Sequence, residues 1–271
     1  MAFFGLDLFK ALSLGLIAGL TEFLPVSTAA HLLFAQRFGR LDAQSLGAAF
    51  VPLIELAALA ALLLVYGARI WRTAAATAND PAARRFAIGL LLAFLPSAVF
   101  GALVHDIVRG ALFNVWAVAF ALIVGGGVLL WAERLELAPR YHEATKFPLA
   151  MCLLIGLAQC AALIPGLSRA GVSIVAALLL GADRRSAADF SLWLAMPGLA
   201  ATLAYDLYRN PVVLGSSSLG VAVTGFAAAF LAAWCVARTF LDFASSRGFA
   251  AFAWWRVILG SLALIGLALG L

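Results

Sequence analysis

The chain alternates long apolar stretches with short polar ones, and six of the apolar stretches are long enough to cross a membrane. A helix of about 18 residues or more, rising ~1.5 Å per residue, spans a ~30 Å hydrocarbon core. The apolar residues form continuous runs and do not alternate with polar ones, which favours helices over barrel strands. The predicted spans are Leu46–Tyr66, Phe86–Val104, Ala111–Trp131, Phe190–Tyr208, Leu219–Leu241 and Phe252–Gly270.

Two further apolar stretches are interrupted by proline. In each, an apolar run ends at a proline and is followed by an apolar piece too short to cross the bilayer. These parts are Leu6–Leu24, Pro25 and Thr28–Phe38 in the first stretch, and Phe147–Ile164, Pro165 and Gly171–Gly181 in the second. Irregular backbone at membrane depth is tolerated only when it is buried in protein or lines a cavity. The pattern therefore predicts two re-entrant helical hairpins.

The order of these elements repeats along the chain. A broken hairpin and three spans fill residues 1–132, a polar link covers 133–146, and a second hairpin with three spans fills 147–271. Because three spans are an odd number, the second half must enter the membrane upside down. We therefore expect one all-α polytopic membrane domain with an inverted-topology repeat. Broken helices at matching positions of such a repeat predict a binding site near the midplane.

Composition agrees with a membrane protein. The chain is 65% hydrophobic and 11% charged, whereas soluble domains carry about 25% charged residues. The net charge of +5 comes from arginines gathered between spans, which indicates membrane topology and not nucleic acid binding. Their distribution makes the link 133–146 cytoplasmic and both termini external. Cys152, Cys160 and Cys235 lie in apolar runs without metal-ligand spacing, as buried apolar residues do.

The first interrupted stretch carries reactive side chains. Between Gly19 and His31 it holds the Glu22 carboxylate, the Ser27 and Thr28 hydroxyls and the His31 imidazole. An ionisable group within a membrane segment marks function by default. His31 lies three residues after Thr28, so a helix would put the two on one face. Histidine suits proton transfer or nucleophilic attack on phosphorus.

The second interrupted stretch supplies groups that bind anions. Arg169 carries a planar fork that matches phosphate oxygens, and Ser168 adds a hydroxyl donor. The short helix that follows offers free backbone N–H groups at its start. We therefore predict one phosphate-handling site built from both stretches. Its further candidate lining residues are Gly166, Gly171, Gln159, Glu55 and Asp189.

At these residues the chain resembles the BacA/UppP family of undecaprenyl pyrophosphate phosphatases. Gly19-Leu-Thr-Glu-Phe-Leu-Pro-Val-Ser27, with His31 after it, is similar to the first signature of that family. Pro165-Gly-Leu-Ser-Arg169, with Gly171, is similar to the second. The resemblance extends over nearly the whole chain.

The resemblance implies an integral enzyme of the bacterial cytoplasmic membrane with inverted repeats and two re-entrant hairpins. Such an enzyme removes the terminal phosphate of undecaprenyl pyrophosphate on the outer face of the membrane. The product is the lipid carrier of peptidoglycan, so the family supports cell wall synthesis and confers bacitracin resistance. The resemblance also implies that Mg²⁺ or Ca²⁺ assists the reaction, and Glu22 is the candidate ligand for this cation. The expected partners are the lipid and the bilayer, with a homodimer kept as an alternative to a monomer.

The chain departs from the family pattern at four places. The family usually carries Glu or Gln where this chain has Ala18, and serine where it has Thr28 and Ala170. A glutamine common in the first span is replaced by Glu55. The loss of one carboxylate and the gain of another suggest a relocated charge, provided that the two positions are close.

Two mechanisms and two functions are compatible with these residues. In one mechanism Thr28 or Ser27 attacks phosphorus, with Glu22 or His31 as base. In the other, His31 attacks or activates water and Glu22 orients it, and in both Arg169 stabilises the transferring phosphoryl group. The alternative function is a non-hydrolytic polyprenyl-phosphate binder or transporter on the same scaffold.

Overall fold

The computed structural model describes residues 2–46, 50–135, 137–209 and 219–270, and no β-strand occurs among them. Six helices are long and apolar enough to cross a membrane, as predicted. They are α3 (Phe50–Ala76), α4 (Pro81–Ala111), α5 (Val115–Arg134), α8 (Arg184–Arg209), α9 (Leu219–Arg247) and α10 (Ala250–Ala268). The chain is therefore an all-α polytopic membrane protein.

The two interrupted stretches each form a helix, a break and a second, short helix. The first comprises α1 (Ala2–Thr21) and α2 (Thr28–Gly39), and the second comprises α6 (Leu149–Gln159), a 3₁₀ turn η3 (Cys160–Leu163) and α7 (Arg169–Leu179). Helix α7 begins at Arg169, before the predicted Gly171, because the Ser168 side chain caps it. Two further 3₁₀ turns, η1 (Gln44–Leu46) and η2 (Ala144–Lys146), lie in connecting segments.

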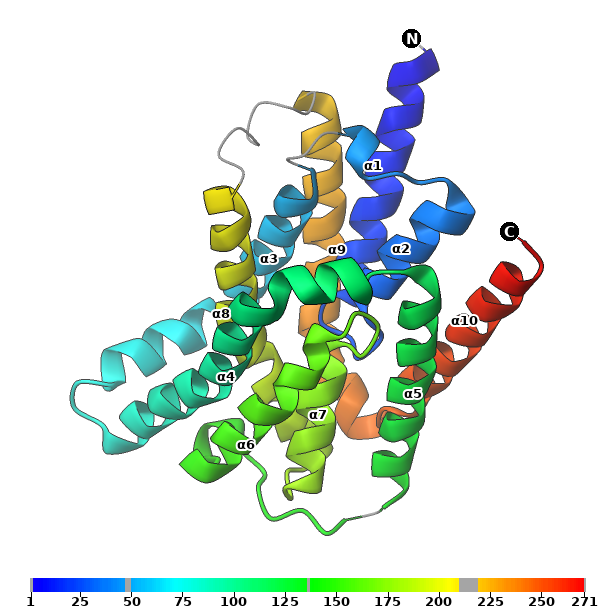
Figure 1. Cartoon of the computed structure of the whole chain (residues 1–271). Coiled ribbons are helices and arrows are strands. Elements are labelled where there is room, and N and C mark those ends of the chain that lie inside the picture. Colours follow the sequence, from blue (N-terminus) through cyan, green and yellow to red (C-terminus); the bar gives the residue numbers. More distant parts are fainter. Residues whose placement is uncertain (1, 47–49, 136, 210–218, 271) are drawn as a thin grey trace.

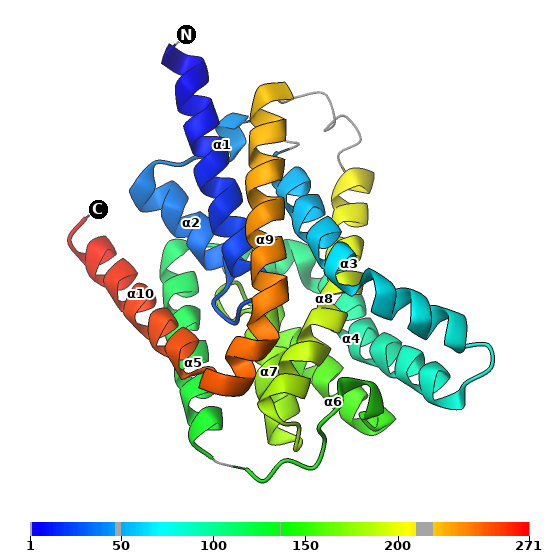
Figure 2. The same ribbon diagram turned by 180° about the vertical axis from the view of Figure 1, so that it is seen from behind.

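The two broken stretches come from opposite ends of the molecule and their breaks lie near its middle (Figures 1 and 2). Helices α1 and α2 lie in the upper half of Figure 1, and α6 and α7 lie in the lower half. Helix α1 packs along α9, α6 packs on α4, and α10 packs along α5. The inverted repeat of residues 1–132 and 147–271 stays a prediction, and the arrangement is compatible with it.

Close contact between α5 and α10 depends on glycine. A Cβ atom added to Gly126 would lie 2.8 Å from the Ala253 carbonyl oxygen and 2.9 Å from a Val257 methyl carbon. Nothing lies within 4 Å of such an atom at Gly127, the next residue. Small residues that let helix backbones approach are typical of membrane helix interfaces. Gly126 thus allows α10 to pack closely against α5.

We expect Gly126→Ala to lower the free energy of unfolding by roughly 1–3 kcal/mol, because the new methyl group overpacks this interface. Gly127→Ala is the matched control. It should be neutral or stabilise the protein by up to ~1 kcal/mol, since alanine favours helix. Thermal unfolding of both variants in detergent measures the difference. Equal melting temperatures would contradict the close packing of α5 against α10.

Candidate functional site

The breaks of the two interrupted stretches line one cavity of about 440 Å³. Both helices that follow the breaks begin at this cavity, α2 with Thr28 and α7 with Arg169. The structure therefore brings together side chains that are far apart in the sequence. The predicted site residues that line the cavity are Glu22, Ser27, Thr28, Glu55, Gly166, Ser168 and Arg169.

An ion pair joins the two stretches. Arg169 Nη2 donates a hydrogen bond to Glu22 Oε1 over 2.7 Å, and the side chains are 28% and 14% exposed. Each charge is the counterion of the other in a largely apolar protein, where an unpaired charge would be costly. Glu22 thus occupies one position on the guanidinium that an anionic ligand would take.

Two serines hold matching positions at the breaks but use their hydroxyls differently. Ser27 and Ser168 are the N-cap residues of α2 and α7, with φ of 71° and 67°. Such a backbone costs of order 1–3 kcal/mol for a residue other than glycine. The Ser168 hydroxyl accepts a hydrogen bond from the Gly171 N–H at 3.2 Å, whereas the Ser27 hydroxyl caps nothing. Ser27 therefore offers an uncommitted hydroxyl in a strained turn that lines the cavity.

The buried residue Arg256, on α10, ties both breaks together. Its guanidinium donates hydrogen bonds to the carbonyl oxygens of Pro25, Gly166 and Leu167, over 3.3, 3.1 and 2.9 Å. Gly125 and Gly171 leave the space that this guanidinium fills. Arg256 was not among the site residues predicted from the sequence, although a lone arginine inside an apolar span is the same kind of signal as Glu22.

His31 is held by two hydrogen bonds outside the cavity. Its Nδ1 lies 2.8 Å from the Ser27 carbonyl oxygen, and its Nε2 accepts a hydrogen bond from Trp255 Nε1 at 2.8 Å. It does not line the cavity, unlike its helix neighbours Thr28 and Leu32. Both ring nitrogens are thus engaged by the protein. This arrangement does not favour the mechanism in which His31 attacks phosphorus or activates water.

Glu55 and Ala18 line the same cavity as Glu22. Glu55 Oε2 is buried and has no hydrogen-bond partner. Ala18, where the family usually carries Glu or Gln, and Glu55, where it commonly carries glutamine, therefore line the same cavity. That proximity is what a relocated charge requires.

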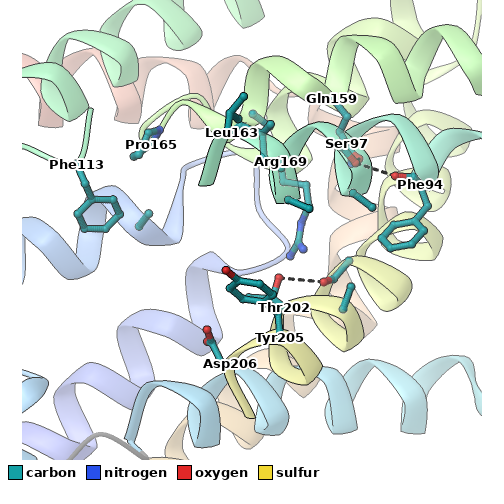
Figure 3. Close-up of a pocket in the computed structure, with 18 residues that line it drawn as sticks. Phe94, Ser97, Phe113, Gln159, Leu163, Pro165, Arg169, Thr202, Tyr205 and Asp206 are labelled. Carbon is teal, nitrogen blue, oxygen red and sulfur yellow. Dashed lines mark hydrogen bonds between the residues drawn. The ribbon is translucent and has the colours of Figure 1, made fainter. Parts of the chain in front are cut away.

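A larger cavity of about 630 Å³ adjoins the first and shares Arg169 with it. Figure 3 shows Arg169 reaching into this space, with Tyr205 and Asp206 of α8 on the facing side. Gln159 lies here and not in the smaller cavity, and its Oε1 accepts a hydrogen bond from Ser97. Gly198 leaves room for the Arg169 guanidinium. The rest of the wall is mostly apolar and suits a hydrocarbon chain.

Asp189 lies outside both cavities. It accepts two hydrogen bonds of 2.7 Å from Arg69 and one of 2.6 Å from the Tyr66 hydroxyl. The Arg69 guanidinium also stacks on Tyr66 and Trp193. Asp189 thus connects α3 to α8, so its place among the candidate lining residues is not supported.

Gly171 lines neither cavity. Because it has no side chain, it leaves room for the neighbouring Ser168 and Arg256 side chains.

Comparison with known proteins identifies similar chains. The family model described as bacitracin resistance protein BacA matches residues 11–262. A protein of Afipia carboxidovorans named undecaprenyl-diphosphatase is 50% identical over 97% of this chain and 98% of its own length. Proteins of the same name from Rhodopseudomonas palustris and Nitrobacter winogradskyi are 50% and 48% identical, over 98% and 97% of this chain and 99% and 98% of their own lengths.

We expect Arg256→Met to loosen both breaks, because three buried carbonyl groups lose their donor at ~1–3 kcal/mol each. Hydrogen–deuterium exchange should rise in residues 22–27 and 164–168 together, and the melting temperature should fall. Arg134→Met, at the exposed end of α5, is the control and should change neither. Faster exchange at only one break would contradict the joint role of Arg256.

Proposed function

The chain belongs to the BacA family, and from this membership and its cavity we propose that it is an undecaprenyl-diphosphatase. It hydrolyses undecaprenyl pyrophosphate to undecaprenyl phosphate and inorganic phosphate. Within the site, the Glu22–Arg169 ion pair supports this assignment most strongly, because it lies where two helices begin. A guanidinium and two helix N-termini directed at one cavity suit a diphosphate head group.

Substrate binding exchanges one anion for another on Arg169. The terminal phosphate displaces the Glu22 carboxylate from the guanidinium, and the N–H groups at the start of α2 and α7 contact its other oxygens. Arg169 then stabilises the charge of the transferring phosphoryl group. The isoprenoid chain leaves through the larger cavity, which shares Arg169 with the smaller one.

Ser27 is the nucleophile that the geometry favours. Its oxygen forms a bond to the terminal phosphorus as the bond from phosphorus to the bridging oxygen breaks, and undecaprenyl phosphate leaves. The hydroxyl proton passes to Glu22, which the substrate has released from Arg169. Water then hydrolyses the phosphoserine and restores the hydroxyl. Thr28 lines the same cavity and is the alternative nucleophile.

A divalent cation would rely on the substrate for part of its coordination. Among the described residues, no group of three or more His, Cys, Asp or Glu side chains is arranged to hold a metal ion. Mg²⁺ is commonly held by one or two carboxylates together with substrate phosphates. Glu22 and Glu55 are the carboxylates that fit this role, and the cation would neutralise charge on the diphosphate.

The protein acts in the bacterial cytoplasmic membrane, with the cavity open to the outer side. The gathering of arginines in the polar links between spans supports this orientation. There the reaction recycles the lipid carrier of envelope polymers. Transport without hydrolysis is not favoured, because the relatives with about half their residues in common are named diphosphatases.

Purified protein in detergent should release phosphate from undecaprenyl pyrophosphate. Arg169→Ala should lower the rate on the order of 10³-fold, since the transferring group loses its main cation. Glu22→Gln should lower it roughly 10²- to 10⁴-fold. Addition of Mg²⁺ or Ca²⁺ should raise the parent rate, and chelator should lower it. Lipid binding without any phosphate release, from a folded protein, would overturn the phosphatase assignment.

Ser27→Ala and Ser168→Ala form a matched pair, because the two serines share a backbone conformation. Ser27→Ala should reduce turnover to background with little change in stability. Ser168→Ala should keep most of kcat, raise KM and lower the free energy of unfolding by ~1 kcal/mol through loss of the cap. Phosphate release and thermal unfolding measure both effects. Equal losses of kcat in the two variants would argue against Ser27 as nucleophile.

A further inference from the structure

Trp255 connects the last transmembrane helix to the backbone of Ser27. Its indole Nε1 donates to His31 Nε2 over 2.8 Å, and the two ring planes are 8° from parallel with centroids 6.1 Å apart, as an in-plane hydrogen bond requires. On the far side of the imidazole, Nδ1 lies 2.8 Å from the Ser27 carbonyl oxygen. Two hydrogen bonds in series therefore run from α10 to the turn that carries the Ser27 hydroxyl.

The donors in this series fix where the imidazole proton lies. An indole N–H can only donate, so Nε2 of His31 must be the acceptor. A carbonyl oxygen can only accept, so Nδ1 must carry the hydrogen. Both contacts require the same neutral tautomer, with its proton on Nδ1. Without the indole, Nε2 has no donor to oppose a proton there, so the Nε2–H tautomer gains population and the hydrogen bond to Ser27 is weakened.

The Ser27 turn needs such support. Its φ of 71° and ψ of 95° lie in a sparsely populated region, and a conformation of this kind persists only when its surroundings hold it. Its carbonyl accepts a hydrogen bond from the His31 N–H over 3.3 Å, besides the imidazole contact. Arg256 holds the nearby Pro25 carbonyl. The imidazole is the side chain that acts on Ser27 itself.

We propose that Trp255 is a positioning residue for the hydrolysis: it holds His31 in the Nδ1–H tautomer, and His31 in turn holds the Ser27 hydroxyl in place in the cavity. This inference rests on the proposed function. It assigns His31 a place in the reaction although the imidazole does not line the cavity. It also makes the indole N–H, and not the bulk of the tryptophan, the group that matters.

Trp255→Phe tests the proposal, because it removes the N–H donor and keeps an aromatic ring, although a smaller one. Trp254→Phe is the control, since the adjacent tryptophan on α10 is about equally exposed, at 50% against 52%. We expect Trp255→Phe to lower kcat on the order of 10- to 100-fold with KM and melting temperature unchanged, as a displaced nucleophile would. Trp254→Phe should retain the parent kcat.

A double-variant comparison tests whether Trp255 acts through His31. In a His31→Ala background, Trp255→Phe should have no further effect on kcat, because the group it acts on is already gone. An unchanged kcat in the single Trp255→Phe variant, or the same fold loss in both backgrounds, would overturn the proposal.

Nitrogen NMR of ¹⁵N-histidine-labelled protein supplies a readout independent of activity. The parent should show the Nδ1–H tautomer at His31, assigned by the signal that His31→Ala removes. Trp255→Phe should raise the fraction of the Nε2–H form and Trp254→Phe should not. An Nε2–H tautomer in the parent would overturn the relay. A parent with the expected tautomer but no phosphate release would overturn the proposed function and leave the hydrogen-bond relay intact.

Discussion

The site depends on how unpaired backbone groups are satisfied within a membrane protein. Two helices break near the middle of the molecule, and each break leaves backbone carbonyl groups without a hydrogen bond within a helix. Arg256 supplies hydrogen bonds to three of them, two at one break and one at the other. A planar group with five donors can do this where water is scarce. Because one guanidinium serves both breaks, the two sides of the cavity are fixed relative to each other.

The fold could be predicted well from sequence because length and apolarity decide which segments cross a bilayer. The prolines that end Leu6–Leu24 and Phe147–Ile164 also located the breaks. Glu22 and Arg169 stood out as charges in apolar surroundings, and their meeting at one cavity followed from the expected repeat. These features are local in the sequence or follow from the order of the helices.

The remaining features depend on contacts between helices that no local pattern encodes. His31 was predicted to act in the reaction from its residue type, but its ring contacts Ser27 and Trp255, which is 224 positions away, and does not line the cavity. Asp189 was predicted to line the phosphate site, but in the structure it binds Arg69 and Tyr66. The different uses of Ser27 and Ser168 were also hidden, since both follow a proline at similar spacing. The difference is that the Gly171 N–H donates a hydrogen bond to the Ser168 hydroxyl, whereas the Ser27 hydroxyl caps no backbone N–H.

In the proposed mechanism, the Glu22 carboxylate competes with anionic ligands for Arg169. An anion that takes the position of Glu22 on the guanidinium must first separate a 2.7 Å ion pair. A small ion such as inorganic phosphate has few other contacts with which to offset that cost. A lipid diphosphate, bound as proposed, has a second phosphate and a hydrocarbon chain, and the chain occupies the neighbouring cavity. In the proposed mechanism the tethered carboxylate thereby favours the lipid diphosphate over small anions, and its return to the guanidinium after the reaction favours release of the product.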